Sequence, residues 1–347
     1  YKIICNQIKK YKPNYFVIID KFIYEKVKKK FKKNKTQIKN NFNDINLKKL
    51  KIDITISSIV GIAGLEPTIK FLISSKKLLI ANKESIICGW HIIKRLASKH
   101  KTKIIPVDSE HFSIRELTKG LNDKSIRKIY LTASGGPFLN KPLKYFSSIK
   151  ANQAIKHPKW KMGKKISVDS STLMNKILEL IEAQKLFNLP QKKLDILIHP
   201  NSLVHAIIEF KNGLKEFIYH ETSMVIPLAN AIFGGKLNIK DFYKLKKDER
   251  NIKSLIFKKV DKRIFPAIQL KERVNEYYST PIIINASNEI LVDQFLRKKI
   301  PFLSIYKTIM KILNDRNYRK YAIRKPKNIL EIIKIDQWAR ESVLKKI

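Results

Sequence analysis

Glycine and cysteine are scarce in this chain of 347 residues, which contains 10 glycines and 2 cysteines. Glycine makes up roughly 7% of ordinary proteins, about twice the fraction present here. Cys5 and Cys88 cannot build a disulfide framework, and such cysteine usage is typical of a reducing compartment. No run approaches the roughly 20 uncharged apolar residues that cross a bilayer, and no secretory signal peptide is recognisable. We therefore expect neither a disulfide-stapled secreted module nor a membrane protein, but a cytoplasmic protein.

Acidic residues are also few: 29 Asp and Glu stand against 72 Lys and Arg, which gives a formal charge of +43. A pI near 10.1 is typical of nucleic-acid-binding proteins. Only 11 of the basic residues are arginine, however, and arginine is the side chain that reads bases and phosphates with paired hydrogen bonds. Lysines occur in every segment, with one dense run at Lys28–Lys35. We interpret the charge as a compositional bias and keep a basic nucleic-acid-associated protein as an alternative.

The hydrophobic content of 44% is enough for a sizeable core, and the length predicts two or three domains. Apolar runs rich in Ile, Val and Leu alternate with helical segments in the first part of the chain. This pattern is typical of a parallel sheet with helices on its faces. The expected strands are Tyr15–Asp20, Ile52–Val60, Lys77–Ala81, Lys103–Val107 and Lys128–Thr132.

The pattern changes after Gly136. A loop-rich stretch leads into an amphipathic helix predicted at Ser170–Phe187 and a strand at Leu194–Ile198. Two antiparallel strands are expected on either side of the turn Lys211-Asn212-Gly213. From about Pro281 the signals are helical, at Asn285–Arg297, Phe302–Asn314 and Asn328–Lys346. The sequence thus predicts an α/β fold in three parts: α/β, then α+β, then a small helical part. The family resemblance given below implies that these parts are an incomplete Rossmann-like domain (1–107), an α+β catalytic domain (108–260) and a small helical domain (261–347).

Several of the scarce glycines follow predicted strands, where open parallel sheets bind ligands. Gly61 and Gly64 follow the second strand, and Gly135 and Gly136 follow the strand Lys128–Thr132. A tight turn would explain the first pair equally well.

Asp108 and Glu110 stand at the end of another strand. Alternation along a strand would place both carboxylates on one face, where they repel each other unless a cation or a proton lies between them. Oxygen ligands suit Mg²⁺ or Mn²⁺. The alternative is an N-cap and a first-turn acid of the following helix.

A third acid, Glu179, lies on the predicted helix Ser170–Phe187. Its spacing from Asn175 and Lys176 allows all three to share one face. Ser170 or Ser171 at the expected helix start would offer an anion site. The alternative for Lys176 and Glu179 is a surface ion pair.

The loop before that helix carries His157, Trp160 and Met162. Two large apolar side chains on a polar loop suggest a lid that closes over a ligand, or else a small cluster packed under the loop. His199 and His205 are interpreted as structural, and Cys5 and Cys88 as buried thiols.

These segments resemble the 1-deoxy-D-xylulose 5-phosphate reductoisomerase family, in order and spacing and over nearly the whole chain. PVDSEH followed by HPKWKMGKKISVDS and MNK is the most specific part. The matching strings are GIAGLEPT (61–68), ANKES (81–85), PVDSEH (106–111), LTASGGPF (131–138), HPKWKMGKKISVDSSTLMNKILELIEA (157–183), ILIHPNSLVHA (196–206) and NASNEI (285–290).

The resemblance implies an NADPH-dependent enzyme of isoprenoid precursor synthesis (the MEP pathway). Such enzymes rearrange and reduce 1-deoxy-D-xylulose 5-phosphate to 2-C-methyl-D-erythritol 4-phosphate. It also implies a homodimer, and a divalent metal, Mg²⁺ or Mn²⁺ with Co²⁺ as a further option, held by Asp108, Glu110 and Glu179.

The resemblance also implies roles for individual side chains. Lys83, Glu110 and His157 would be catalytic, and Asn82, Glu84 and Gly163 would contact NADPH. Trp160 and Met162 would cover the substrate. The implied substrate-binding residues are Lys83, Ser109, Glu110, Ser134, His157, Ser170, Asn175, Lys176 and Glu179.

The chain departs from the family pattern in two places. The glycine-rich GxTGxxG turn that cradles the dinucleotide is absent, and the sequence opens at Tyr1 as if inside a helix. We expect a fragment, and the alternative is a catalytically dead remnant. The second departure is His220–Pro227, where many members carry Pro-Asp-Met-Arg before the proline. We expect it to affect the adjoining loop and the dimer surface rather than the chemistry.

Overall fold

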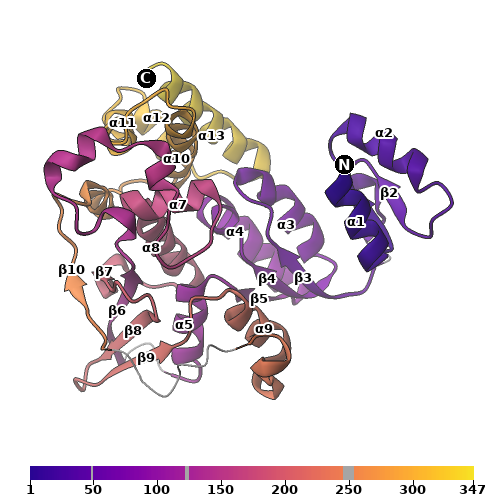
Figure 1. Cartoon of the computed structure of the whole chain (residues 1–347), viewed down its shortest axis with the longest axis horizontal. Coiled ribbons are helices and arrows are strands. Elements are labelled where there is room, and N and C mark those ends of the chain that lie inside the picture. Colours follow the sequence, from indigo (N-terminus) through magenta and orange to yellow (C-terminus); the bar gives the residue numbers. More distant parts are fainter. Residues whose placement is uncertain (48–49, 122–124, 245–253) are drawn as a thin grey trace.

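The computed structural model describes residues 1–47, 50–121, 125–244 and 254–347 (Figure 1). This part of the chain contains three sheets, the helices that connect and cover their strands, and a group of C-terminal helices. Among the described residues, no helix combines the length and the apolar character needed to cross a membrane.

The N-terminal residues form a small unit of their own (Figure 1). It contains α1 (Lys2–Tyr11), β1 (Tyr15–Val17), α2 (Lys21–Lys30) and β2 (Gln37–Lys39), and β1 pairs with β2 in parallel. The predicted strand Tyr15–Asp20 is shorter than expected because Asp20 caps α2, accepting a hydrogen bond from the N–H of Ile23 at 2.8 Å. Its core is separate from that of the rest of the molecule.

A three-stranded parallel sheet follows, with strand order β3-β4-β5. Its strands are β3 (Ile52–Ser57), β4 (Ser75–Ile80) and β5 (Lys103–Pro106), linked by α3 (Leu65–Leu72) and α4 (Lys83–His100). Ser57 lies beside Ile80, and Ile80 beside Pro106, so the carboxyl ends of the strands share one edge. Ligands bind at such an edge.

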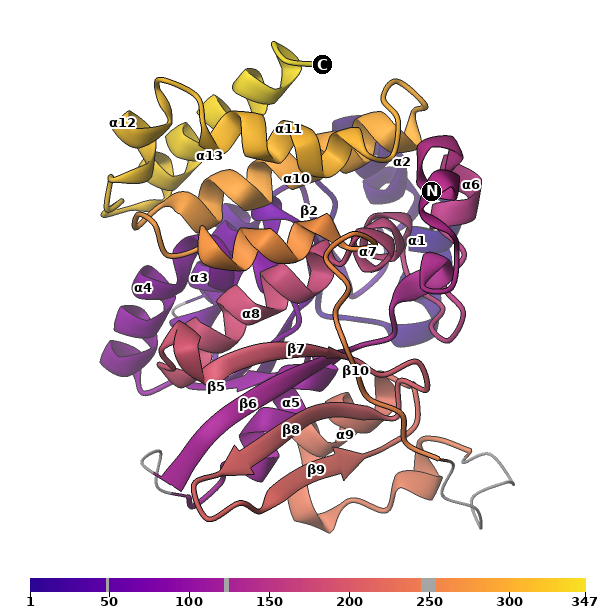
Figure 2. The ribbon, with the colours of Figure 1, turned by 90° about the vertical axis from the view of Figure 1, so that its left-hand side faces the viewer.

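The predicted strand Lys128–Thr132 does not extend that sheet. It is β6 (Ile126–Ala133), the centre of a second, five-stranded sheet of order β10-β7-β6-β8-β9 (Figure 2). β6 is parallel to β7 (Leu194–Ile198) and antiparallel to β8 (Val204–Phe210). The expected antiparallel pair is confirmed as β8 with β9 (Lys215–Tyr219), and β10 (Lys258–Lys259) lies on the far edge. α5 (Ser109–Leu117) packs on β8, close to the end of β5.

The predicted helix Ser170–Phe187 is two helices. α7 (Lys164–Thr172) ends and α8 (Met174–Phe187) begins at Leu173, whose φ of 67° is left-handed. Leu173 is buried in the main core, so tertiary packing imposes a conformation that its own propensity opposes. The end of α7 also lies against Gly136, where an added β-carbon would be 3.0 Å from the Cα of Ser171.

The C-terminal helices pack against α4 and α8 and complete the main core (Figure 1). The remaining α-helices of the described residues are α6 (Ala151–Ala154), α9 (Val225–Phe233), α10 (Thr280–Leu296), α11 (Ser304–Leu313), α12 (Tyr318–Ala322) and α13 (Ile329–Leu344). α10, α11 and α13 overlap the three predicted helices, whereas α12 was not expected. The α/β fold class with a C-terminal helical part is confirmed.

Candidate active site

A cavity of about 240 Å³ lies where the ends of β5 and β6 meet α8, under the loop that carries Trp160 and Met162. Its walls contain most of the residues that the sequence singled out. They are Lys83, Asp108, Ser109, Glu110, Ser134, His157, Ser170, Asn175, Lys176 and Glu179. The placement of Trp160 and Met162 on the cavity wall agrees with the predicted lid.

Asp108 and Glu110 have the arrangement that the sequence offered as the alternative, an N-cap and a first-turn acid. β5 ends at Pro106, so the two residues stand at the N-cap and in the first turn of α5 rather than alternating along a strand. The Asp108 side chain makes no capping hydrogen bond, and its Oδ2 lies 3.0 Å from the ammonium of Lys83. Burial would raise the pKa of Asp108, but Lys83 and His111 hold it well below its ordinary value. The N-cap position is therefore used to aim a carboxylate into the cavity.

Glu110 and Glu179 share the ammonium of Lys176, which pairs with both carboxylates. Glu179 also accepts hydrogen bonds from Asn175 and, at 3.3 Å, from Lys83. Burial and the nearby charge of Glu179 raise the pKa of Glu110 to about 8, although Lys176 acts in the opposite direction. Glu110 thus holds a proton more tightly than an ordinary carboxyl because it is buried and other acids lie beside it.

The three acids fit a divalent cation. Asp108, Glu110 and Glu179 each offer one carboxylate oxygen, and these oxygens all lie within 4.8 Å of one another. A donor set made only of oxygens suits Mg²⁺ or Mn²⁺. A dication would also neutralise the repulsion that raises the pKa of Glu110.

Ser134 and His157 form the opposite wall. The Nδ1 of His157 accepts hydrogen bonds from the backbone N–H groups of Lys159 and Trp160, so a neutral ring carries its proton on Nε2. Nε2 lies 2.9 Å from Ser134 Oγ, which also accepts from the N–H of Gly136 at 3.0 Å. The Ser134 hydroxyl proton is then available to a ligand. Burial, together with Lys176, lowers the pKa of His157 to about 4 and keeps the ring neutral.

Ser170 was expected at a helix start, and this expectation is wrong. Ser170 lies in the last turn of α7. The left-handed Leu173 instead brings the first turn of α8, with Asn175 and Lys176, up to the same cavity. N–H groups at the start of a long helix favour an anion, so the helix start beside this cavity that could bind an anion is that of α8 and not that of α7.

The expected cofactor residues do not line this cavity. Asn82 caps α4, and its amide donates to the carbonyls of Ile59 (2.6 Å) and Gly61 (3.1 Å), which holds the loop after β3 in place. Glu84 pairs with Lys165 at 3.1 Å. Gly163 stands at the N-cap of α7, with open space beside it. Asn82 and Glu84 lie just beyond β4, at the ligand edge of the parallel sheet.

Several residues near the site were missed or set aside. Ser202, His205 and Met224 line the cavity. The ring of His205 stacks on that of His220 at 4.0 Å and meets Trp160 edge-on at 6.0 Å. The structural interpretation of His205 therefore needs correction, and the departure at His220–Pro227 reaches the site as well as the adjoining loop. Ser202 and His205 lie inside the matched string ILIHPNSLVHA (196–206), and Met224 lies in the segment that departs from the family; only these positions could have indicated them. His199 is different, since its Nδ1 lies 2.8 Å from the carbonyl oxygen of Ile256 and its ring stacks on Phe257.

The fold is α/β, and one cavity brings three carboxylates that could hold a divalent cation close to a helix start that could bind an anion. The sequence matches known families throughout. Residues 1–89 match the family described as 1-deoxy-D-xylulose 5-phosphate reductoisomerase, and residues 104–187 match the C-terminal domain of that name. Residues 221–342 match the DXP reductoisomerase C-terminal domain.

Curated relatives and solved structures agree with these matches. The reductoisomerase of Pelagibacter ubique (strain HTCC1062) is 42% identical over 97% of this chain and 88% of its own length. That of Thermodesulfovibrio yellowstonii is 37% identical over 99% and 89%. A crystal structure of DOX-P reductoisomerase with NADPH, fosmidomycin and magnesium has a TM-score of 0.90 and 29% identity, covering 99% of this chain and 88% of that one. The Zymomonas mobilis enzyme with NADPH gives a TM-score of 0.84. The chain belongs to the 1-deoxy-D-xylulose 5-phosphate reductoisomerase family.

Proposed function

We propose that this chain catalyses the reaction for which its family is named: the NADPH- and divalent-metal-dependent rearrangement and reduction of 1-deoxy-D-xylulose 5-phosphate to 2-C-methyl-D-erythritol 4-phosphate. The observation that carries the proposal is the convergence of Asp108, Glu110 and Glu179 with two lysines in one cavity. The cation and the substrate phosphate would then lie close together in the same small cavity.

Each wall has its own task in the proposed mechanism. Ser134, His157, Ser170, Asn175 and Lys176 surround the phosphate, and the neutral His157 orients the hydroxyl of Ser134 towards it. The Lys83 ammonium, held by Asp108 and Glu179, lies where it can donate a hydrogen bond to a sugar oxygen. Trp160 and Met162 cover the cavity and exclude water.

The three carboxylates of the cavity would bind the metal and transfer protons. Asp108, Glu110 and Glu179 would hold a divalent ion that, when bound, acts as a Lewis acid on the substrate oxygens. Glu110 lies on the cavity wall, where its carboxylate can accept a proton from a substrate hydroxyl and return it. Magnesium and manganese suit the oxygen ligands best, and cobalt is a further option.

NADPH would lie against the ligand edge of the parallel sheet. Asn82 shapes the loop from Ile59 to Gly61, and Glu84 connects the start of α4 to Lys165 on α7. With Gly163 at the start of α7, these residues would form the part of the cofactor site next to the substrate. The nicotinamide ring then supplies the hydride.

Turnover of two carboxamide variants tests this function. Glu110→Gln and Glu179→Gln remove a metal ligand while keeping the side-chain shape. We expect kcat/KM for NADPH oxidation, with the sugar phosphate and Mg²⁺, to fall at least about 1000-fold, or about 4 kcal/mol. The matched control is Glu116→Gln on α5, which alters a half-buried ion pair with Arg115 outside the cavity. Near-parental turnover in either cavity variant, with circular dichroism showing a folded protein, would refute the metal assignment.

Three broader features belong to the same proposal. The division at residues 107 and 260 would separate the cofactor, catalytic and C-terminal helical domains. Free, buried Cys5 and Cys88 suit a cytoplasmic location, because reducing compartments preserve thiols. A second copy of the chain would cover the outer face of the five-stranded sheet. There Tyr130, Ile207 and Phe217 line a hollow of about 1050 Å³, and Phe217 is 43% exposed.

A further inference from the structure

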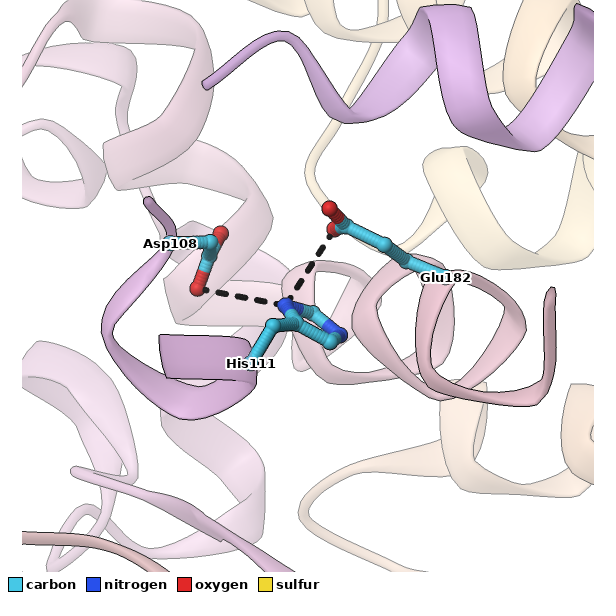
Figure 3. A group of neighbouring side chains, drawn as sticks. All are labelled: Asp108, His111 and Glu182. Carbon is cyan, nitrogen blue, oxygen red and sulfur yellow. Dashed lines mark ion pairs between the residues drawn. The ribbon is translucent and has the colours of Figure 1, made fainter. Parts of the chain in front are cut away.

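His111 and Glu182 form a buried ion pair (Figure 3). Neither side chain lines the cavity. The exposed fraction is 0% for the His111 side chain and 1% for that of Glu182. His111 lies on α5, and Glu182 lies on α8, one turn beyond Glu179. Burying a carboxylate is costly unless a partner compensates for its lost hydration. Among the described residues, His111 is the only side chain that forms an ion pair with Glu182.

The imidazole of His111 reaches both elements that carry metal ligands. Its Nε2 lies 2.9 Å from the backbone carbonyl oxygen of Glu179, which can only accept, so Nε2 carries a proton. Its Nδ1 faces two carboxylates, 3.6 Å from Asp108 Oδ1 and 3.5 Å from Glu182 Oε2 (Figure 3). The ring also stacks on Phe187 with an interplanar angle of 14°. One ring therefore contacts a carboxylate ligand at the start of α5 and the backbone of another ligand on α8.

The place of Asp108 depends on this arrangement. Its Oδ2 is held by Lys83 at 3.0 Å, and its Oδ1 faces His111. Without Glu182, nothing charged holds Nδ1 in place from the α8 side in the described structure. The ring would turn, and both the Asp108 carboxylate and the Glu179 backbone would lose a contact. Groups that orient ligands in this way typically change metal affinity by about 10–100-fold when removed.

We propose that Glu182 is a positioning residue for the divalent-metal site, acting through His111 on Asp108 and Glu179. This inference rests on the proposed function, since it takes Asp108, Glu110 and Glu179 as the metal ligands. Glu182 touches neither the substrate nor the metal. Its task is to fix the angle at which α5 and α8 present their carboxylates.

Mn²⁺ binding without turnover tests this proposal. Free Mn²⁺ is measured by electron paramagnetic resonance during titration of the full chain, and circular dichroism confirms that each variant is folded. Glu182→Met removes the acceptor at nearly constant size, and we expect the Mn²⁺ Kd to rise about 10–100-fold. Glu182→Gln keeps an oxygen that can accept a hydrogen bond from Nδ1, so its Mn²⁺ Kd should rise less than that of Glu182→Met. Glu116→Met on α5 is the matched control, with a Kd within about twofold of the parent's.

Two further variants separate the possible failures. If Glu182→Met does not fold, the double variant His111→Gln/Glu182→Met leaves no charge unpaired and must still bind Mn²⁺ weakly. A parental Kd in folded Glu182→Met, or in that double variant, overturns the proposal. Binding of two Mn²⁺ per chain also overturns it, because Asp108, His111 and Glu182 would then hold an ion themselves. Glu179→Gln should abolish binding, and if it does not, the proposed metal site itself is wrong.

Discussion

His157 is the side chain whose protonation state the structure defines most fully. Two backbone N–H groups point at its Nδ1, and Ser134 Oγ lies beside its Nε2. If Nδ1 were protonated, it could no longer accept the hydrogen bonds from these two N–H groups. Burial and the Lys176 charge both disfavour the imidazolium, which explains the lowered pKa.

This predicts the pH behaviour of His157. Its NMR signals should titrate with a midpoint near 4, so the ring stays neutral throughout the range from pH 5 to 8. Because the unfolded chain binds this proton at about pH 6.5, protonation favours unfolding as the pH falls below that value. A titration of ¹⁵N-histidine-labelled protein, assigned with His157→Gln, measures the midpoint. A midpoint near 6.5 would contradict the half-buried position of His157 close to Lys176.

Residues within one local string were the predictable part of the site. Helical spacing correctly indicated that Asn175, Lys176 and Glu179 share a face, because that relation depends only on local geometry. Ser202 and His205 reach the cavity because β8 pairs antiparallel with β6, a non-local relation that no local pattern contains.

The break between α7 and α8 is the element that most shapes the site. Leu173, at φ 67°, turns the chain so that the end of α7 and the start of α8 both face the cavity. In the single continuous helix that the sequence predicted, Ser170 and Asn175 would lie on the same helix instead of on α7 and α8. Leucine is a good helix former, so the break comes from core packing and not from local preference.

Two substitutions at Leu173 test the backbone conformation. Both Leu173→Ala and Leu173→Gly lose a buried side chain, which costs about 2–5 kcal/mol of unfolding free energy. In the left-handed region glycine avoids a penalty of roughly 1–2 kcal/mol, so the glycine variant should be the more stable of the two. In a continuous helix, glycine would instead be less stable than alanine by about 1 kcal/mol. Urea denaturation gives the order, and the reverse order would refute the break.

At the scale of the whole molecule, two sheets meet at the cavity, and this division was only partly predictable. The alternation of strands and helices correctly indicated β3, β4 and β5 as parallel neighbours. It gave no reason for β6 to leave that sheet, because β6 is as apolar as the others. The choice depends on non-local pairing with β7 and β8.

We predict that the chain forms a dimer through the outer face of the five-stranded sheet. Phe217→Asp places a charge on the outer face of the five-stranded sheet, where Ile207 is its cross-strand neighbour. We expect the parent to have the mass of a dimer by light scattering and the variant that of a monomer, because the interface would have to bury an unpaired charge. Phe22→Asp on α2, also exposed, is the control and should remain dimeric. A monomeric parent, or a dimeric Phe217→Asp, would contradict the assignment of this face.

Anomalous diffraction from crystals grown with Mn²⁺ tests the central claim most directly, since it locates the ion without reference to activity. If these three acids bind the metal, one strong manganese peak lies within coordination distance of a carboxylate oxygen from each of Asp108, Glu110 and Glu179. The Lys176 ammonium should have moved away from Glu110 and Glu179 to make room. A fully occupied manganese ion anywhere else, with these three carboxylates still paired only to Lys83 and Lys176, would contradict it.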